Sequence, residues 1–302
     1  MEIAVAIPTY NRPDDLRRCI RSIAGQSLAP SRVLVIDDGE LAPESIADMR
    51  QTLEAAGSKL VYHRKDHGRI GRGLSESRNL AVHAIDEPVL LIDDDIVLDR
   101  ECLLNLAKAW TDWDDGKLIG VGGVIRNDRR VGAVEKFYNR IFFLDSKSPW
   151  DINDIGYQVW DNSLMRREAG HYAHGGFCLY RPELARKVLF PAFQGGRPGL
   201  EDVHFALTAK ILGYRFVIEP KATCRHLHSP SARDSQYSTG FRESVNRKII
   251  FGDLCDNRRG NRLRFAWASV GWILRQFLVG HFAKGAGMTV GMFASPRSPE
   301  GV

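Results

Sequence analysis

Three consecutive carboxylates, Asp93, Asp94 and Asp95, follow a short apolar run in the segment LLIDDDIVLD (90–99). Such a run is typical of a buried strand, and like charges at its end repel one another and are costly to desolvate. A divalent cation such as Mg²⁺ or Mn²⁺ would offset that cost, because carboxylate oxygens are suitable ligands for it. The alternative is that Asp95 or Asp99 caps the following helix, which accounts for one acid but not for three. The segment therefore predicts a divalent-cation site.

Two further segments carry groups that could contact a nucleotide. VIDDG (35–39) ends an apolar run with Asp37 and Asp38, which either accept hydrogen bonds from a ribose or base or form an Asp-Gly turn. GRIGRGLSESRN (68–79) is glycine-rich and leads into a helix, so it could hold phosphate. Its glycine spacing differs from the dinucleotide-binding fingerprint. Three arginines in it could face a diphosphate or simply lie on the surface: Arg69, Arg72 and Arg78.

Two later segments could supply a base and a further metal ligand. Glu201 and Asp202 open an expected helix after the glycine-rich FQGGRPG. They either complement the helix dipole or include a general base that takes a proton from a hydroxyl. In RHLHS, His226 and His228 alternate, so they share one face of an extended segment. One of them could complete a Mn²⁺ shell begun by Asp95, or both could be structural.

The elements that position these residues alternate over the first 125 residues. Apolar runs predict strands and amphipathic stretches predict helices, the strands at 3–8, 32–37, 59–64, 88–93 and 117–125, the helices at 12–26, 43–57, 74–85 and 100–110. This order predicts an α/β fold with a mostly parallel sheet and helices on both faces. Ligands bind at the carboxyl ends of such strands, so both acid clusters should lie along one rim.

The pattern changes after about residue 126. Residues 126–175 are polar, aromatic and glycine-rich, as in long loops over a binding cleft. A helix is expected at 201–214 and a strand at 215–220, and the chain from about 240 onward should be helical.

Composition narrows the class of protein. The net charge is +5 and the pI about 9.0, with most of the basic excess in residues 225–275. This suits an anionic partner such as phosphate, acidic lipid or nucleic acid, or it is a solvated face. The five cysteines form no CxxC pair and indicate reduced thiols of a cytoplasmic protein. The first residues lack the basic region of a signal peptide, and no apolar stretch predicts a spanning helix.

Taken in order, six segments resemble the family 2 glycosyltransferases of the GT-A fold. They are VAIPTYNRP with LRRCIRSIAGQS, VLVIDDG, SRNLAV, LLIDDD, GGFCLYRPEL and GLEDVHFALTAKILGYRF. The resemblance covers about residues 3–230. It implies a catalytic domain at 1–232, with a nucleotide-binding Rossmann-like half and an acceptor-binding half, followed by a helical, basic and aromatic extension at 233–302.

The resemblance also implies roles for single residues. The nucleotide pocket would contain Pro8, Thr9, Tyr10, Arg12, one of Asp37 and Asp38, Arg72, Arg78, Asp93 and Asp94. The donor sugar or acceptor would lie near Gly175, Gly176 and Trp160. Asp95 and one of His226 and His228 would bind the metal, although the triple Asp leaves Asp94 or Asp95 open as the ligand. Asp202 would be the catalytic base, with Glu201 near the acceptor.

The implied reaction is metal-dependent and inverts the anomeric centre. A divalent cation, Mn²⁺ or Mg²⁺, would neutralise charge on the leaving nucleoside diphosphate, for which we expect UDP. Asp202 would deprotonate the acceptor hydroxyl, which belongs to a glycan or a lipid-linked molecule. Residues 126–175 and 190–199 are expected to select the sugar and acceptor.

The region 260–293 is apolar, basic and aromatic. It could lie in the interface of the inner face of the cell membrane, pack back on the catalytic domain, or form a homodimer contact. Three other functions compete with glycosyl transfer. A nucleotidyltransferase should carry a glycine- and lysine-rich loop after the first strand, and PTYNRPDD has none. A non-catalytic nucleotide-sugar or carbohydrate-binding protein would not need Asp202, and nucleic-acid binding would leave the acids unexplained.

Overall fold

The computed structural model describes residues 1–128, 131–193, 199–229 and 234–295. Most of the segment FQGGRPG, in which we expected a glycine-rich loop before the helix at 201, lies outside the described residues. Within these residues the central sheet has nine strands, eight of them in the order β3-β2-β1-β4-β10-β6-β11-β5, and β9 pairs with β11 beside this path. A short hairpin, β7-β8, forms a second sheet.

The strands are β1 (Ala4–Thr9), β2 (Arg32–Asp37), β3 (Lys59–Arg64), β4 (Val89–Ile92), β5 (Ile96–Leu98), β6 (Leu118–Ile125), β7 (Asp151–Ile152), β8 (Gln158–Val159), β9 (Glu168–Gly170), β10 (Phe177–Tyr180) and β11 (Arg215–His226). The helices are α1 (Pro13–Ala24), α2 (Pro43–Ala55), α3 (Leu74–Ala84), α4 (Cys102–Trp113), α5 (Ala133–Ile141), α6 (Pro182–Val188), α7 (Glu201–Ile211), α8 (Gln236–Leu254), α9 (Arg259–Leu278) and α10 (Phe282–Phe293).

The expected mostly parallel sheet flanked by helices is confirmed. The strands β1, β2, β3 and β4 are parallel, as are β6 and β11. Their apolar side chains are buried on both faces, in two core clusters that the helices cover. The register pairs Thr9 with Asp37, so the ends of β1 and β2 lie side by side at the rim where we expected the site.

Three strands run against the others. β10 lies antiparallel between β4 and β6, and β5 and β9 are antiparallel to β11. β10 is buried throughout, and a continuous apolar run does not reveal strand direction. The strand expected at 215–220 continues through a change of register to His226, which pairs with Ile96. This pairing brings the His-x-His segment beside the three acids.

We expected the segment 126–175 to consist of long loops, but part of it is regular structure. It contains α5, the β7-β8 hairpin and β9. The helix α5 has no fully buried residue, and it packs on α9, which is far away in the sequence. Its partner is therefore not visible in the local pattern, and this part of the prediction was wrong.

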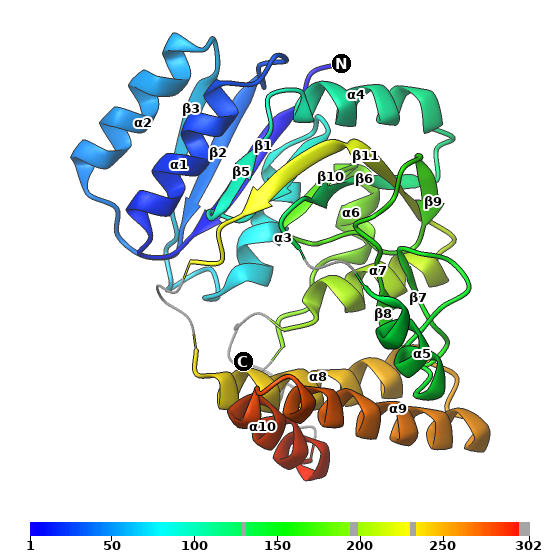
Figure 1. The fold of residues 1–302 in the computed structure, drawn as a ribbon. Coiled ribbons are helices and arrows are strands. Elements are labelled where there is room, and N and C mark those ends of the chain that lie inside the picture. Colours follow the sequence, from blue (N-terminus) through cyan, green and yellow to red (C-terminus); the bar gives the residue numbers. More distant parts are fainter. Residues whose placement is uncertain (129–130, 194–198, 230–233, 296–302) are drawn as a thin grey trace.

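The expected helices after residue 240 are present, and they pack back on the sheet domain. Figure 1 shows α8, α9 and α10 as one layer at the base of the molecule. Arg247 on α8 is buried and donates hydrogen bonds to Gly156 O at 2.6 Å and Gln158 Oε1 at 3.0 Å. Tyr157 contacts Ser269 of α9 at 3.1 Å. None of the helices in the described ranges has the length and apolar character needed to cross a bilayer.

Candidate active site

The three consecutive acids after β4 are each held by a different basic side chain. The pairs are Asp93 with Arg78 (3.0 Å), Asp94 with Arg12 (3.1 Å) and Asp95 with His226 (3.0 Å). The basic partners come from α3, the turn after β1 and the end of β11, and all three are predicted site residues. The mutual repulsion of the acids is thus offset within the chain, one side chain at a time.

The carboxyl groups of Asp94 and Asp95 differ in their tendency to ionise. Burial raises the pKa of Asp94 to about 6, although hydrogen bonds from Thr9 and Arg12 oppose it. Burial acts in the same direction on Asp95, but the hydrogen bond and charge of His226, the Ser229 N–H and the charge of Arg12 together outweigh it and lower the pKa of Asp95 to about 2. The contact with Asp95 also raises the pKa of His226 against the effect of burial. Asp95 is therefore the more firmly anionic of the two, as a metal ligand must be.

The donor set of Asp95 and His226 fits a divalent cation. Two ligand atoms that lie about 2.1 Å from a cation at right angles are about 3.0 Å apart, and Asp95 Oδ1 lies 3.0 Å from His226 Nε2. No group of three or more His, Cys, Asp and Glu residues is arranged around a cation position in the described ranges. Two protein ligands suffice where substrate phosphates supply others. His228 Nε2 lies 3.7 Å from Asp128 Oδ1, whereas His226 lies beside Asp95, so His226 is the better candidate ligand.

The two acids at the end of β2 have different surroundings. Asp37 is buried and accepts hydrogen bonds from two backbone N–H groups of the following turn, at 2.8 Å each, and from the Tyr62 hydroxyl at 2.7 Å. Asp38 is partly exposed, accepts from Gly73 N at 2.7 Å and lies 3.0 Å from the buried Lys65 ammonium. Asp37 thus builds the turn that the sequence left open as an alternative, and Asp38 is the more exposed of the two acids. Lys65 was not predicted as a site residue, because a single lysine after a strand is not a recognisable motif.

Arg78 joins the strand-end acids to the start of α7. Its Nη2 donates to Asp93 at 3.0 Å and its Nη1 to Glu201 Oε1 at 2.9 Å. Burial disfavours the guanidinium charge, but the two carboxylates outweigh burial and raise the pKa of Arg78 above its ordinary value. Burial raises the pKa of Glu201, and Arg78 opposes that rise. The arginine is therefore a buried bridge between the two acidic segments.

The backbone of the GG-F segment passes between these side chains. A Cβ atom on Gly175 would lie 2.6 Å from Asp202 Cβ and 2.9 Å from Arg78 Nη1. A Cβ atom on Gly176 would overlap the carboxylate of Asp93. Both positions need a residue without a side chain, which places this backbone in contact with both acidic segments.

Replacing Arg78 with methionine is expected to lower the free energy of unfolding by about 3–5 kcal/mol, because the buried Glu201 and the partly exposed Asp93 lose the buried cation that they share. The matched control is Arg126→Met, which breaks the exposed pair of Arg126 with Asp99 at 2.7 Å. That change should cost about 1 kcal/mol or less. Urea denaturation of both variants measures the difference. Equal, small losses would show that the buried bridge does not stabilise the fold.

Asp202 directly follows Glu201 in the first turn of α7 and lies among aromatic side chains. Its Oδ2 accepts a hydrogen bond from the Tyr172 hydroxyl at 2.9 Å and a longer one from Gly175 N at 3.4 Å. Burial and the neighbouring carboxylate raise the pKa of Tyr172, so the hydroxyl remains a donor. The rings of Trp160 and Tyr172 lie edge-on to His174, at 5.6 and 5.8 Å between centroids. Tyr172 and His174 were missed as site residues, although their place just before GG-F was a usable signal.

The other predicted residues are spread around this centre. Pro8 is buried in β1, and Tyr10 is exposed just after it. Arg69 and Arg72 are exposed, and neither contacts an acid of the β4 or α7 segments among the described residues. Of the three arginines in the glycine-rich segment, the structure therefore brings Arg78 into the cluster and leaves two at the surface.

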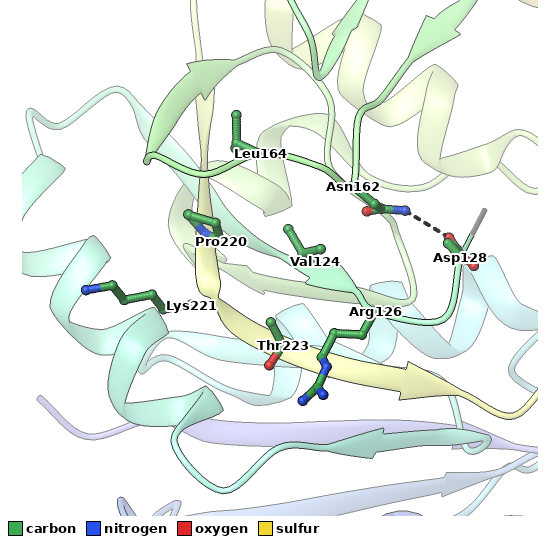
Figure 2. Close-up of a pocket in the computed structure, with 8 residues that line it drawn as sticks. All are labelled: Val124, Arg126, Asp128, Asn162, Leu164, Pro220, Lys221 and Thr223. Carbon is green, nitrogen blue, oxygen red and sulfur yellow. Dashed lines mark hydrogen bonds between the residues drawn. The ribbon is translucent and has the colours of Figure 1, made fainter. Parts of the chain in front are cut away.

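An open pocket of about 510 Å³ lies beside the cluster, at the edge formed by β6 and β11. Figure 2 shows its lining residues, with Asn162 donating a hydrogen bond to Asp128 at 3.2 Å. None of the lining residues was predicted as a site residue. The pocket adjoins the cluster through Asp128, which faces His228.

Three comparisons relate the chain to known proteins. The family model for glycosyl transferase family 2 matches residues 4–188. Over 245 residues the chain is 25% identical to galactofuranosyltransferase GlfT2 of Mycobacterium tuberculosis, covering 74% of this chain and 37% of that protein. The chain thus spans little more than a third of the curated relative that it matches.

Two solved structures are similar in fold. One is the mannosyltransferase PcManGT from Pyrobaculum calidifontis in complex with GDP-Man and Mn2+, with 18% identity, a TM-score of 0.55 and coverage of 96% of this chain and 79% of that one. The other is S. aureus TarS 1-349 in complex with UDP-GlcNAc, with 17% identity, a TM-score of 0.57 and coverage of 93% and 76%. At these identities the likeness shows the fold.

Proposed function

The chain belongs to glycosyl transferase family 2 and is a glycosyltransferase with a GT-A fold, and we propose that it moves a sugar from a nucleoside-diphosphate sugar to an acceptor hydroxyl with inversion at the anomeric centre. The observation that carries this proposal is the buried bridge of Arg78 between Asp93 and Glu201. It brings the acids at the strand ends next to the candidate base, Asp202. The complexes of the two structural relatives with nucleotide sugars support a donor of this kind.

The nucleotide would bind along the ends of β1, β2 and β4. Thr9 and Arg12 already hold Asp94 there, and Tyr10 is exposed beside them. Asp38 is the better candidate for the base, because the turn and Tyr62 occupy Asp37. We expect the nucleotide to be UDP. In this arrangement Arg78 holds Asp93 in place near the ribose and diphosphate.

Asp95 and His226 would hold the divalent cation, Mn²⁺ or Mg²⁺. When bound, the cation supplies Lewis-acid stabilisation of the charge on the leaving diphosphate. The chain contributes a pre-positioned carboxylate, since Ser229 N donates to Asp95 Oδ2 at 3.1 Å while Oδ1 faces His226. The Mn2+ in the complex of the Pyrobaculum calidifontis mannosyltransferase supports a cation at the corresponding step.

Asp202 would take the proton from the acceptor hydroxyl. The acceptor oxygen then forms a bond to the anomeric carbon while the bond from that carbon to the diphosphate oxygen breaks, and a single displacement of this kind inverts the centre. Tyr172 and Gly175 hold the Asp202 carboxylate from one side. Glu201 is tied to Arg78 and to Gly199 N at 2.7 Å, so it is the less available of the two acids.

The acceptor side would be formed by the aromatic group around Asp202, with Trp160 as its outer member. We propose that residues 1–232 act as the catalytic domain and that 233–302 form an extension. Through 260–293 this extension would contact the inner face of the cell membrane peripherally, where a lipid-linked or cell-envelope acceptor is presented.

Thermal-shift measurements with nucleotide sugars test the proposed donor, cation and class of enzyme together. We expect a UDP-sugar to raise the melting temperature in the presence of Mn²⁺ and to do so much less without it, because a ligand stabilises the state that binds it. Nucleoside triphosphates serve as the control for a nucleotidyltransferase. A larger shift with triphosphates, or no shift with any nucleotide sugar and Mn²⁺, would contradict the proposal.

A further inference from the structure

Two helices from distant parts of the sequence carry exposed apolar stripes. On α5 the exposed residues are Val134 (86%), Phe137 (69%) and Ile141, spaced by three and four positions. On α9 they are Leu263 (67%), Trp267, Val270, Leu274 and Leu278 (68%), again at helical spacing. We call these eight residues the α5–α9 face. Isolated exposed apolar residues need no explanation, but two matched stripes do.

The two helices lie against each other and run in opposite directions. Tyr138 donates a hydrogen bond to Gly271 O at 2.7 Å, and Trp267 Nε1 donates to Ile141 O at 2.9 Å. Glu135 pairs with Arg275 at the other end, so residue numbers rise along one helix as they fall along the other. Figure 1 shows α5 beside α9 in the layer at the base of the molecule.

This pairing puts both stripes on one side of the helix pair. The contacts between the helices use positions 135 and 138 of α5 and 271 and 275 of α9. The exposed residues at 134, 137, 270 and 274 each precede a contact residue by one, which is a rotation of about 100°. In two antiparallel helices that face each other, the same rotation from the contact line leads to the same side. The stripes therefore form one continuous apolar surface.

The charge around this surface is positive. Residues 257–295 include six Lys and Arg residues and no Asp or Glu. Arg259 and Arg262, in the first turn of α9, are exposed and make no ion pair with any described residue. Lys136 and Arg140 are exposed on α5. An apolar stripe edged by arginine and lysine is the pattern of a helix that lies in the interface of an anionic membrane.

We propose that the α5–α9 face is a membrane-docking surface, with its apolar stripes at the headgroup boundary of an anionic bilayer and its arginines on the lipid phosphates. This deepens the peripheral membrane contact in the proposed function, and it adds α5, which lies outside the 260–293 region. A second copy of the chain fits the surface less well, because residues 257–295 carry basic residues and no acid, so two copies would bring positive charge together.

Vesicle flotation of the full chain tests this surface. The vesicles contain equal parts of anionic phosphatidylglycerol and neutral phosphatidylcholine, and vesicles of phosphatidylcholine alone are the comparison. We expect the unmodified protein to float with the anionic vesicles and to lose binding in high salt. Phe137→Asp on α5, Leu278→Asp on α9 and the pair Arg259→Glu with Arg262→Glu should each reduce partitioning about tenfold or more. Ile211→Asp, at a residue 58% exposed on α7, is the matched control.

The outcomes separate this inference from the enzymatic proposal. Asp202→Asn should float as the unmodified protein does, and the Phe137 and Leu278 variants should hold nucleotide sugar with unchanged affinity. Absence of flotation by the unmodified protein would overturn the docking surface and leave the enzymatic proposal standing. Normal flotation of the Phe137 variant would remove α5 from the surface. A dimer in light scattering that Phe137→Asp and Leu278→Asp dissociate would identify a second copy as the occupant and overturn the proposal.

Discussion

Replacing Asp202 with asparagine is expected to lower the rate of sugar transfer by about a thousandfold or more, within the range that a positioned general base contributes. Asparagine has nearly the same shape, and its amide oxygen can still accept the hydrogen bond that Tyr172 donates at 2.9 Å. The variant therefore loses the proton acceptor while the local packing is kept. The measurement is transfer at saturating donor and acceptor, together with calorimetric binding of UDP and Mn²⁺.

Binding of the nucleotide separates this result from a folding defect. The Asp202 variant should bind UDP in the presence of Mn²⁺ with nearly unchanged affinity, because the acids on the nucleotide side are Asp93, Asp94 and Asp95. Asp253→Asn, at an exposed acid near the end of α8, is the control and should keep its activity. Transfer by Asp202→Asn at more than about a tenth of the normal rate would be incompatible with a base at this position.

The sequence predicted much of the fold because the nucleotide side is built from local patterns. Each strand from β1 to β4 is a short apolar run, and each intervening helix carries its own apolar spacing, so every element is recognisable by itself. The rule that ligands bind at strand ends then placed Asp38 and Asp93 on one rim. The structure confirms the parallel order that this inference needed.

The contacts between distant segments could not be predicted in the same way. Arg78 reaches Glu201 across 123 positions, and nothing near either residue marks the other as its partner. The helix α5 owes its place to α9, and the direction of β10 depends on which neighbours it joins. The hydrogen bond from the Tyr172 hydroxyl to Asp202 likewise joins residues 30 positions apart. These features are set by tertiary packing, which overrides the local pattern.

The structure also changes the electrostatic question posed by the three acids. Arg78, Arg12 and His226 offset the acids one by one. A cation is therefore not the only charge that can offset the repulsion between these acids. In the proposed site it would instead take the place of the proton that Asp95 and His226 share, and this makes Asp95 a sharper test of metal binding than the cluster as a whole.

Replacing Asp95 with alanine should abolish the gain in UDP affinity that Mn²⁺ provides, a loss of about a hundredfold or more if the cation bridges protein and diphosphate. The carboxylate is the anionic member of the proposed donor pair, and His226 alone would hold the cation weakly. The matched control is Asp99→Ala in the same segment. The Asp99 carboxylate contacts Arg126 at 2.7 Å and Thr223 at 2.5 Å. Its partners are therefore different from those of Asp95, and it is not expected to bind the cation.

Calorimetric titration of UDP with and without Mn²⁺ decides between these positions. In the unmodified protein and in Asp99→Ala the cation should strengthen binding, whereas in Asp95→Ala the two titrations should coincide. Asp95→Asn should behave as the alanine variant does, because an amide keeps the shape and the acceptor for Ser229 N but not the charge. A cation effect that survives in both Asp95 variants but disappears in Asp94→Asn would move the metal ligand to Asp94. The sequence left that alternative open, and the contacts of Asp94 argue against it, since Thr9 and Arg12 occupy its two carboxylate oxygens at 2.8 and 3.1 Å.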